Sequence, residues 1–276
     1  MKIDSHQHFW NYDPQNYGWI NSEMSVLKRD FLPADLLQEL NQNGLDGSVA
    51  VQASQTEFET EYLLGFARNY EFVKAVVGWV DLRSKNIDER LQHYQGAPKL
   101  AGFRHVVQDE PDENFMLRKD FQNGISLLEK YGFTYDILIF PNQLEAALQT
   151  IKNFPNQKFV VDHIAKPRIK EGIIEPWGHL MGQIAACNNV WCKISGMVTE
   201  ADWQNWSKDD FTPYLDLVLG AFGTDRIMSG SDWPVCLLAG KYEEVKGVVD
   251  DYFQGFSDNE KSKIFGENAA AFYEII

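Results

Sequence analysis

The chain has 276 residues, of which 44% are hydrophobic and 24% are charged, so it can bury a sizeable core and is not expected to be disordered. Acidic residues outnumber basic ones by 40 to 25, and the net charge of −15 argues against nucleic acid or an anionic membrane as a partner. The N-terminus lacks the apolar run of a signal peptide, and no segment has the roughly 18 apolar residues of a membrane span. The three cysteines form no Cys-x-x-Cys pair, so we expect reduced thiols and a cytoplasmic protein.

The first predicted strand carries two histidines, His6 and His8. Side chains two residues apart lie on the same face of a strand, so both imidazoles leave this strand in parallel. Ions of the zinc type bind neutral ring nitrogens at roughly 2.0–2.1 Å and need several of them to converge. A His-x-His pair also occurs by chance, and its meaning depends on whether further ligands follow.

Short apolar segments alternate with segments of helical periodicity along the rest of the chain. Between them, residues 11–30 form a polar and aromatic segment that we expect at the catalytic rim of a barrel. The later predicted strands are residues 47–53, 72–80, 100–107, 133–139, 158–163, 189–195 and 226–232. The predicted helices are residues 33–40, 57–70, 86–94, 114–131, 141–154, 175–187, 209–222 and 242–252.

Eight such alternations predict an α/β protein with a single (β/α)8 barrel domain over residues 1–276. The same eight alternations fit a doubly wound sheet less well. No Gly-x-Gly-x-x-Gly sequence or P-loop follows any predicted strand, so a nucleotide-binding α/β fold has no support.

In such a barrel, residues at the C-terminal ends of the strands converge on one pocket. The polar residues predicted there are His6, His8, Arg104, His105, Asp136, Asp162, His163, Lys193, Ser195 and Asp232. Taken singly, each has a structural alternative, such as a hydrogen-bonded core histidine or a turn aspartate. Neighbours on a strand face opposite sides, so Arg104 and His105 cannot both reach the pocket without a bulge. We favour Arg104, whose guanidinium offers a planar set of donors to a substrate.

Four motifs in chain order resemble the amidohydrolase superfamily. They are the His-x-His pair, Asp162-His163-x-x-Lys166-Pro167, Lys193-x-Ser195-Gly196 and Ser231-Asp232-Trp233-Pro234. More closely, the chain resembles the amidohydrolase-2 branch, which contains sugar lactonases of the L-fuconolactonase and L-rhamnonolactonase type. The resemblance spans essentially the whole chain and implies a barrel hydrolase.

The resemblance also implies roles for individual residues. His6, His8 and Asp232 match metal ligands, with His163 nearby, and the same four residues form the expected catalytic group, with Asp232 as general base. The fifth strand has no histidine, so at most one divalent ion of the zinc type is expected, and relatives include enzymes that need none. Arg104, His105, Asp136 and Trp233 are the expected substrate-binding residues.

The function expected from this resemblance is hydrolysis of a sugar-acid lactone in carbohydrate catabolism, by attack of a water that Asp232 activates. An aldonolactone of a deoxy sugar such as L-fucose or L-rhamnose is the expected substrate. One alternative is a metal-dependent decarboxylase of the same superfamily, and another is a non-catalytic barrel that binds sugar acids. The sequence leaves open the sugar, the ring size, the metal and the oligomeric state, a homo-oligomer included.

Overall fold

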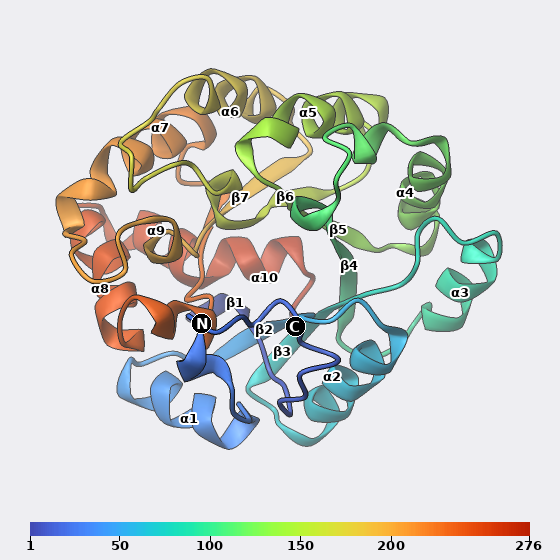
Figure 1. Ribbon diagram of the computed structural model, residues 1–276, viewed down its shortest axis with the longest axis horizontal. Coiled ribbons are helices and arrows are strands. Elements are labelled where there is room, and N and C mark those ends of the chain that lie inside the picture. Colours follow the sequence, from blue (N-terminus) through green and yellow to red (C-terminus); the bar gives the residue numbers. More distant parts are fainter.

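The computed structural model describes all 276 residues, and its eight parallel strands hydrogen-bond to one another in sequence order (Figure 1). The strands are β1 (Ile3–Gln7), β2 (Gly47–Val51), β3 (Val73–Gly78), β4 (Leu100–Val106), β5 (Thr134–Leu138), β6 (Phe159–Val161), β7 (Val190–Ile194) and β8 (Ile227–Ser229). Next to β8, the His8 amide donates to the Trp233 carbonyl at 2.7 Å and the Asp232 amide donates to the His6 carbonyl at 2.9 Å. These bonds bring the two ends of the sheet together, and the predicted (β/α)8 barrel is confirmed.

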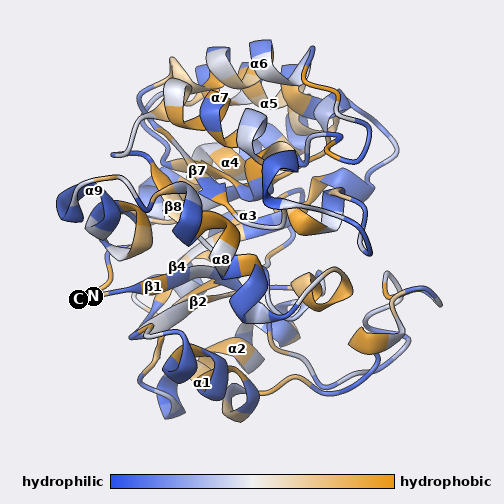
Figure 2. Cartoon of the chain, turned by 90° about the vertical axis from the view of Figure 1, so that its left-hand side faces the viewer, coloured by the Kyte–Doolittle hydropathy of each residue, from blue (hydrophilic) through white to orange (hydrophobic).

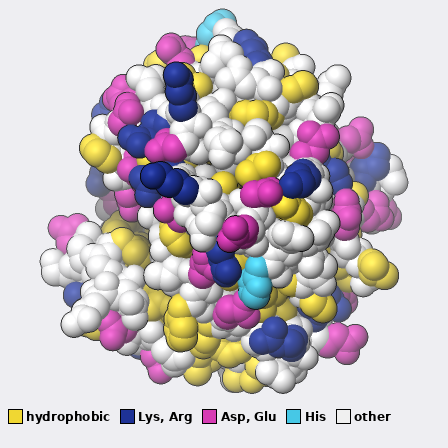
Figure 3. Space-filling model, turned by 90° about the vertical axis from the view of Figure 1, so that its right-hand side faces the viewer, with side chains coloured by type: hydrophobic (Ala, Val, Ile, Leu, Met, Phe, Trp, Pro, Cys, Tyr) yellow, Lys and Arg dark blue, Asp and Glu magenta, His cyan; other side chains and the backbone are white.

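Helices surround the strands and turn their hydrophobic sides toward them (Figure 2). They are α1 (Pro33–Gln42), α2 (Glu57–Asn69), α3 (Ile87–Tyr94), α4 (Lys119–Tyr131), α5 (Leu144–Asn153), α6 (Trp177–Ala185), α7 (Thr212–Phe222), α8 (Tyr242–Tyr252), α9 (Asp258–Ser262) and α10 (Asn268–Phe272). No helix combines the length and the hydrophobicity needed to cross a membrane. On the face drawn in Figure 3, acidic and basic side chains are interspersed.

The lower part of the barrel interior is apolar and is closed by the C-terminal helix α10, which lies across the centre of the view in Figure 1. We call this group of buried side chains the floor cluster. It consists of Ile3, Val49, Val51, Ala75, Val77, Val160, Met228, Ala269, Phe272 and Tyr273. These side chains fill the middle of the barrel and separate the pocket at its C-terminal end from a second cavity of about 590 Å³ at its N-terminal end, which Phe272 and Tyr273 help to line.

All of the later strands are shorter than predicted, and in two of them the difference affects the placement of site residues. The sixth strand ends at Val161 and the eighth at Ser229, so His163 and Asp232 lie beyond the strands. Both residues have positive φ, 53° for His163 and 59° for Asp232, which a strand does not allow. The backbone therefore turns sharply at these two positions and directs both side chains into the barrel mouth.

Candidate active site

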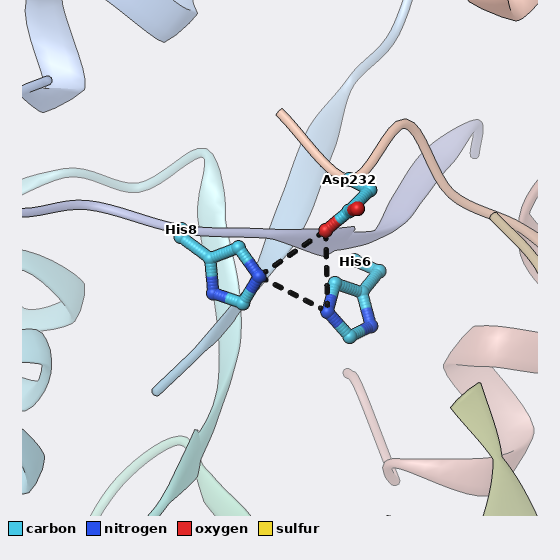
Figure 4. Close-up of side chains that lie close together, drawn as sticks. All are labelled: His6, His8 and Asp232. Carbon is cyan, nitrogen blue, oxygen red and sulfur yellow. Dashed lines mark hydrogen bonds and ion pairs between the residues drawn. The ribbon is translucent and has the colours of Figure 1, made fainter. Parts of the chain in front are cut away.

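His6 on β1, His8 directly after that strand and Asp232 after β8 meet at the C-terminal end of the barrel (Figure 4). The Nε2 atoms of His6 and His8 are 3.2 Å apart. Oδ1 of Asp232 lies 3.3 Å from Nε2 of His8 and 3.9 Å from Nε2 of His6. Nε2 of His163 lies 3.8 Å from the same carboxylate oxygen, and all four residues are buried. The structure thus brings together the four residues predicted as catalytic and metal-binding.

The position of His163 depends on an unusual turn. Residues 163–166 all have positive φ, between 47° and 57°, although none of them is glycine. Each such residue costs about 1–2 kcal/mol relative to a right-handed conformation, so the surrounding structure must hold this turn in place. Ser195 Oγ hydrogen-bonds Nδ1 of His163 at 2.8 Å, and a Cβ on Gly196 would come within 2.5 Å of that nitrogen. The Ser-Gly pair after β7 therefore orients the His163 ring and leaves space for it.

The donor atoms of His6, His8 and Asp232 fit a divalent cation. Nδ1 of His8 donates to the Val51 carbonyl at 2.7 Å, so Nε2 of a neutral His8 ring points its lone pair at the Asp232 carboxylate. Two facing acceptors need a positive charge between them, either a proton or a metal ion. In a tetrahedral zinc site with bonds of about 2.0–2.1 Å, neighbouring ligand atoms lie roughly 3.3 Å apart, close to the separations found here.

The protonation states suit both metal binding and base catalysis. Burial raises the pKa of Asp232, but the neighbouring His163 and His8 outweigh this effect and hold the pKa below its usual range. Burial and the charge of Lys193 hold the pKa of His6 well below its ordinary value, and burial does the same for His163. At neutral pH, the site therefore has an ionised carboxylate beside two neutral imidazoles.

A buried set of charges lies between this site and the floor cluster. Nζ of Lys193 is 2.6 Å from Asp136, 3.0 Å from Asp162 and 3.1 Å from Nδ1 of His6. The Tyr273 hydroxyl donates to Asp136 at 2.8 Å. His6, Asp162 and His163 form a second group with the spacing of metal ligands, but the Lys193 ammonium already lies beside two of them. These contacts agree with the expectation of at most one ion.

Of the two adjacent residues on β4, only Arg104 faces the barrel interior. Its Nη1 lies 3.0 Å from Asp162 and 3.2 Å from Nε2 of His6. The His105 ring points to the other face, where Nε2 lies 2.7 Å from Glu110 and the ring stacks on Phe115. The strand alternation that favoured Arg104 is thus observed.

A cavity of about 430 Å³ opens above these groups, and we call it the mouth cavity. Such a volume suits a small molecule. Four of the predicted site residues line it: His8, Arg104, His163 and Asp232. Residues of the loops line the other side, among them Asn16, Trp19, Met24, Gln55, Gln108 and Lys166. The long segment after β1 therefore does lie at the rim, as expected.

Three residues predicted to bind substrate do not line the mouth cavity. His105 faces outward from the barrel, and Asp136 is fully buried between Lys193 and Tyr273. Trp233 is 2% exposed and packs edge-on against Phe31, with ring centroids 5.3 Å apart. Direct substrate contact does not fit these positions.

Most residues that line the mouth cavity, Trp19 and Lys166 among them, were not among the predicted site residues. Lys166 could have been found from its place in the Asp-His-x-x-Lys-Pro motif. Trp19 lies in the aromatic segment of residues 11–30, where the sequence alone does not distinguish an aromatic side chain that lines the cavity from one that packs in the core.

Comparisons with known proteins cover the whole chain. The Amidohydrolase family model matches residues 3–275. An L-fucono-1,5-lactonase of Burkholderia multivorans is 39% identical over 286 residues, covering 100% of this chain and 96% of that protein. An L-fucono-1,5-lactonase of Burkholderia ambifaria is 35% identical over 281 residues, with the same coverage. A crystal structure of a Burkholderia multivorans amidohydrolase with bound zinc superposes with a TM-score of 0.96 at 39% identity, covering 100% of both chains.

Proposed function

The chain belongs to the amidohydrolase family, and we propose that it hydrolyses the lactone of a deoxy sugar acid, with L-fucono-1,5-lactone as the first candidate. The observation that carries the proposal is the ionised Asp232 among three histidines at the base of the mouth cavity. Full-length similarity to two proteins named as lactonases supports this reaction over a decarboxylase or a non-catalytic sugar-acid binder. As part of this proposal, the enzyme acts in the cytoplasm, in sugar catabolism.

Asp232 performs the proton transfers in this proposal. Its carboxylate accepts a proton from water as the water oxygen attacks the lactone carbonyl carbon. When the tetrahedral intermediate collapses, the bond between that carbon and the ring oxygen breaks, and Asp232 returns the proton to the ring oxygen. The products are a free hydroxyl and a carboxylic acid, which ionises in water. The lowered pKa of Asp232 keeps it ready to accept the first proton at neutral pH.

The carbonyl oxygen gains negative charge during the attack and requires positive partners. Arg104 lies on the cavity wall and carries a fixed charge, which Asp162 and the Gln52 carbonyl hold in one orientation. His6, His8 and Asp232, with His163 nearby, would hold a zinc-type ion, which would supply Lewis acidity and a bound water of lowered pKa. The preformed position of Arg104 allows turnover without an obligatory ion.

The lining of the mouth cavity suits a sugar ring. Amide side chains such as Asn16, Gln55 and Gln108 offer donors and acceptors for hydroxyl groups, whereas Trp19 and Met24 offer apolar surface. A 6-deoxy sugar presents both kinds of surface, because a methyl group stands where the parent sugar has a hydroxymethyl group.

A hydrolysis screen tests the proposal. Protein would be mixed with L- and D-aldonolactones of both ring sizes in a pH-indicator assay, before and after chelation, with metal content measured on the same samples. We expect stereoselective hydrolysis of L-fucono-1,5-lactone or a close analogue. Absence of turnover in every sample, including metal-loaded ones, would exclude a lactonase and favour the decarboxylase alternative.

A further inference from the structure

Three successive backbone carbonyls at the end of β2 each accept a hydrogen bond from a side chain of the site. The Val51 carbonyl accepts from Nδ1 of His8 at 2.7 Å, and the Gln52 carbonyl accepts from Nη2 of Arg104. The Ala53 carbonyl accepts from Nε1 of Trp19 at 3.1 Å. This short segment therefore sets the positions of one histidine of the reaction centre and two residues of the cavity wall.

One buried carboxyl group, that of Glu59, holds the far end of this segment. Glu59, in the first turn of α2, accepts from the Ala53 amide through Oε1 at 2.8 Å and from the Ser54 amide through Oε2. The Glu59 residue is 3% exposed and forms no ion pair with a lysine or arginine. Burial raises the pKa of Glu59 to about 8, against the lowering effect of the two amide bonds and of Arg104. At neutral pH the side chain is therefore largely an uncharged carboxyl group, and the Ala53 and Ser54 amides are its only hydrogen-bond partners. Loss of either bond would leave a buried polar group unpaired.

The sequence around Glu59 has the form of an ordinary helix cap. Thr56 and Glu59 are spaced as in a capping box, in which the glutamate carboxylate would accept from the Thr56 amide. Here the Thr56 hydroxyl does cap the helix, accepting from the Glu59 amide at 3.2 Å. The Glu59 carboxylate instead reaches back to Ala53 and Ser54, and the Thr56 amide donates to the Ser54 carbonyl. The Glu59 side chain thus forms its hydrogen bonds with the loop at the barrel mouth and not with the backbone of its own helix.

We propose that Glu59 is a positioning residue for substrate binding: it fixes the Ala53–Ser54 backbone, and through it the cavity-wall positions of Trp19 and Arg104. The inference rests on the proposed function in one respect, that the mouth cavity receives a sugar lactone. Glu59 itself does not line the cavity.

The anchor of His8 is independent of Glu59. Val51 is the last residue of β2 and pairs with Val77 in the sheet, and the Gln52 amide donates to the Val77 carbonyl at 2.9 Å. Loss of the Glu59 contacts therefore frees the backbone after Gln52 and leaves the Val51 carbonyl in place. Arg104 also keeps its ion pair with Asp162 at 3.0 Å, so the displacement should be larger at Trp19 than at Arg104. This separation predicts a larger effect on KM, through Trp19, than on kcat, through His8 and Arg104.

The test compares Glu59→Gln and Glu59→Asp with Glu61→Gln, a control at an exposed position of the same helix. A glutamine places an NH2 group against one of the two amide donors, so one hydrogen bond is lost. For Glu59→Gln we expect KM to rise about tenfold, the equivalent of one hydrogen bond, with kcat within about threefold. Glu59→Asp should raise KM less, and Glu61→Gln should match the wild type.

Two further measurements separate positioning from a general loss of structure. Hydrogen exchange should accelerate in the peptide containing Ala53 and Ser54 in Glu59→Gln and not across the barrel. Combining Glu59→Asp with Trp19→Phe should raise KM by less than the product of the single effects, because both changes break the same chain of contacts. This cycle also carries the test if Glu59→Gln does not fold.

Unchanged KM and unchanged local exchange in the Glu59 variants would overturn the inference, as would multiplicative effects of Glu59→Asp and Trp19→Phe. If hydrogen exchange accelerated across the whole barrel in both Glu59 variants, and kcat and kcat/KM fell equally, Glu59 would have a merely structural role. If the wild type hydrolyses no lactone, the proposed function fails by itself, and local exchange still reports whether Glu59 holds the loop.

Discussion

The two ends of the barrel interior differ in chemistry. The floor cluster is almost entirely apolar and is closed by α10, whereas the mouth contains ionisable side chains of six strands or the turns that follow them. Burying apolar surface stabilises the fold, and burying charge costs stability unless each charge is paired. The comparison indicates that stability and chemistry are separated along the barrel axis, with Lys193 and its two aspartates at the boundary.

The largest effect is expected at the mouth, from Asp232→Asn. The amide cannot accept a proton from water, so kcat/KM should fall by about 10³-fold or more. The fold should persist, because the change removes a buried charge. Lactone hydrolysis and thermal unfolding would be measured together, with Asp109→Asn at the exposed cavity rim as control. Activity similar to the wild type in Asp232→Asn would remove Asp232 as the base.

At the boundary, Lys193→Met should reduce both stability and activity. It leaves Asp136 and Asp162 buried without their shared cation, a change that typically costs about 3–5 kcal/mol. Urea unfolding would measure the loss, and Lys193→Met combined with Asp136→Asn should recover part of it. A single variant as stable as the wild type would show that these charges are not coupled.

A change in the floor cluster should reduce stability alone. Phe272→Ala removes a buried ring that packs on Trp191, and we expect a loss of about 3 kcal/mol in the free energy of unfolding. At a temperature where the variant is folded, kcat/KM should stay within about twofold of the wild type, since Phe272 belongs to the floor cluster and does not line the mouth cavity. Phe58→Ala, at a side chain that is 78% exposed, is the matched control. A large loss of activity in Phe272→Ala would contradict the separation.

The last expected effect is a pH dependence of stability that originates at Glu59. Its pKa is raised to about 8 in the folded protein, so the folded state binds a proton more tightly than the unfolded state. Stability from this group is fully present below its ordinary pKa and is lost as pH rises toward 8, by at most about 1.4 kcal/mol per pH unit. The Glu59→Gln variant has no titratable group at this position, so its stability should not show this decrease with pH.

Urea unfolding of both proteins at several pH values would measure that difference. The stability of the wild type relative to Glu59→Gln should fall as the pH is raised from about 5 to 8. Because both proteins contain the same histidines, taking the difference between them cancels the histidine contributions. A difference independent of pH would place the Glu59 pKa outside this range.

The barrel and the cluster of His6, His8, His163 and Asp232 could be predicted because their signals are local in sequence. Alternating apolar and helical segments set the strand count, and the His-x-His, Asp-His and Ser-Asp-Trp-Pro motifs follow individual strands. The alternation of side chains on β4 also predicted correctly that only one of Arg104 and His105 faces the barrel interior. In each case, the position of a residue along its own strand was sufficient.

Contacts between distant segments could not be predicted in this way. Asp136 was expected to bind substrate, yet its carboxylate contacts Lys193 and the hydroxyl of Tyr273, which is 137 residues further along the chain. Trp233 was expected at the rim, but it packs against Phe31. The role of Glu59 was hidden because its spacing from Thr56 is that of a helix cap.

The bond between Tyr273 and Asp136 has a consequence for the order in which the protein is made. Synthesis proceeds from the N-terminus, and Tyr273 leaves the ribosome after all eight strands. Until then, the nascent barrel holds the Asp136–Lys193 pair without its last hydrogen-bond donor and with the floor cluster exposed from below. The final helical turn therefore completes the interior, and a nascent chain that stalls before it would expose apolar surface to chaperones and proteases.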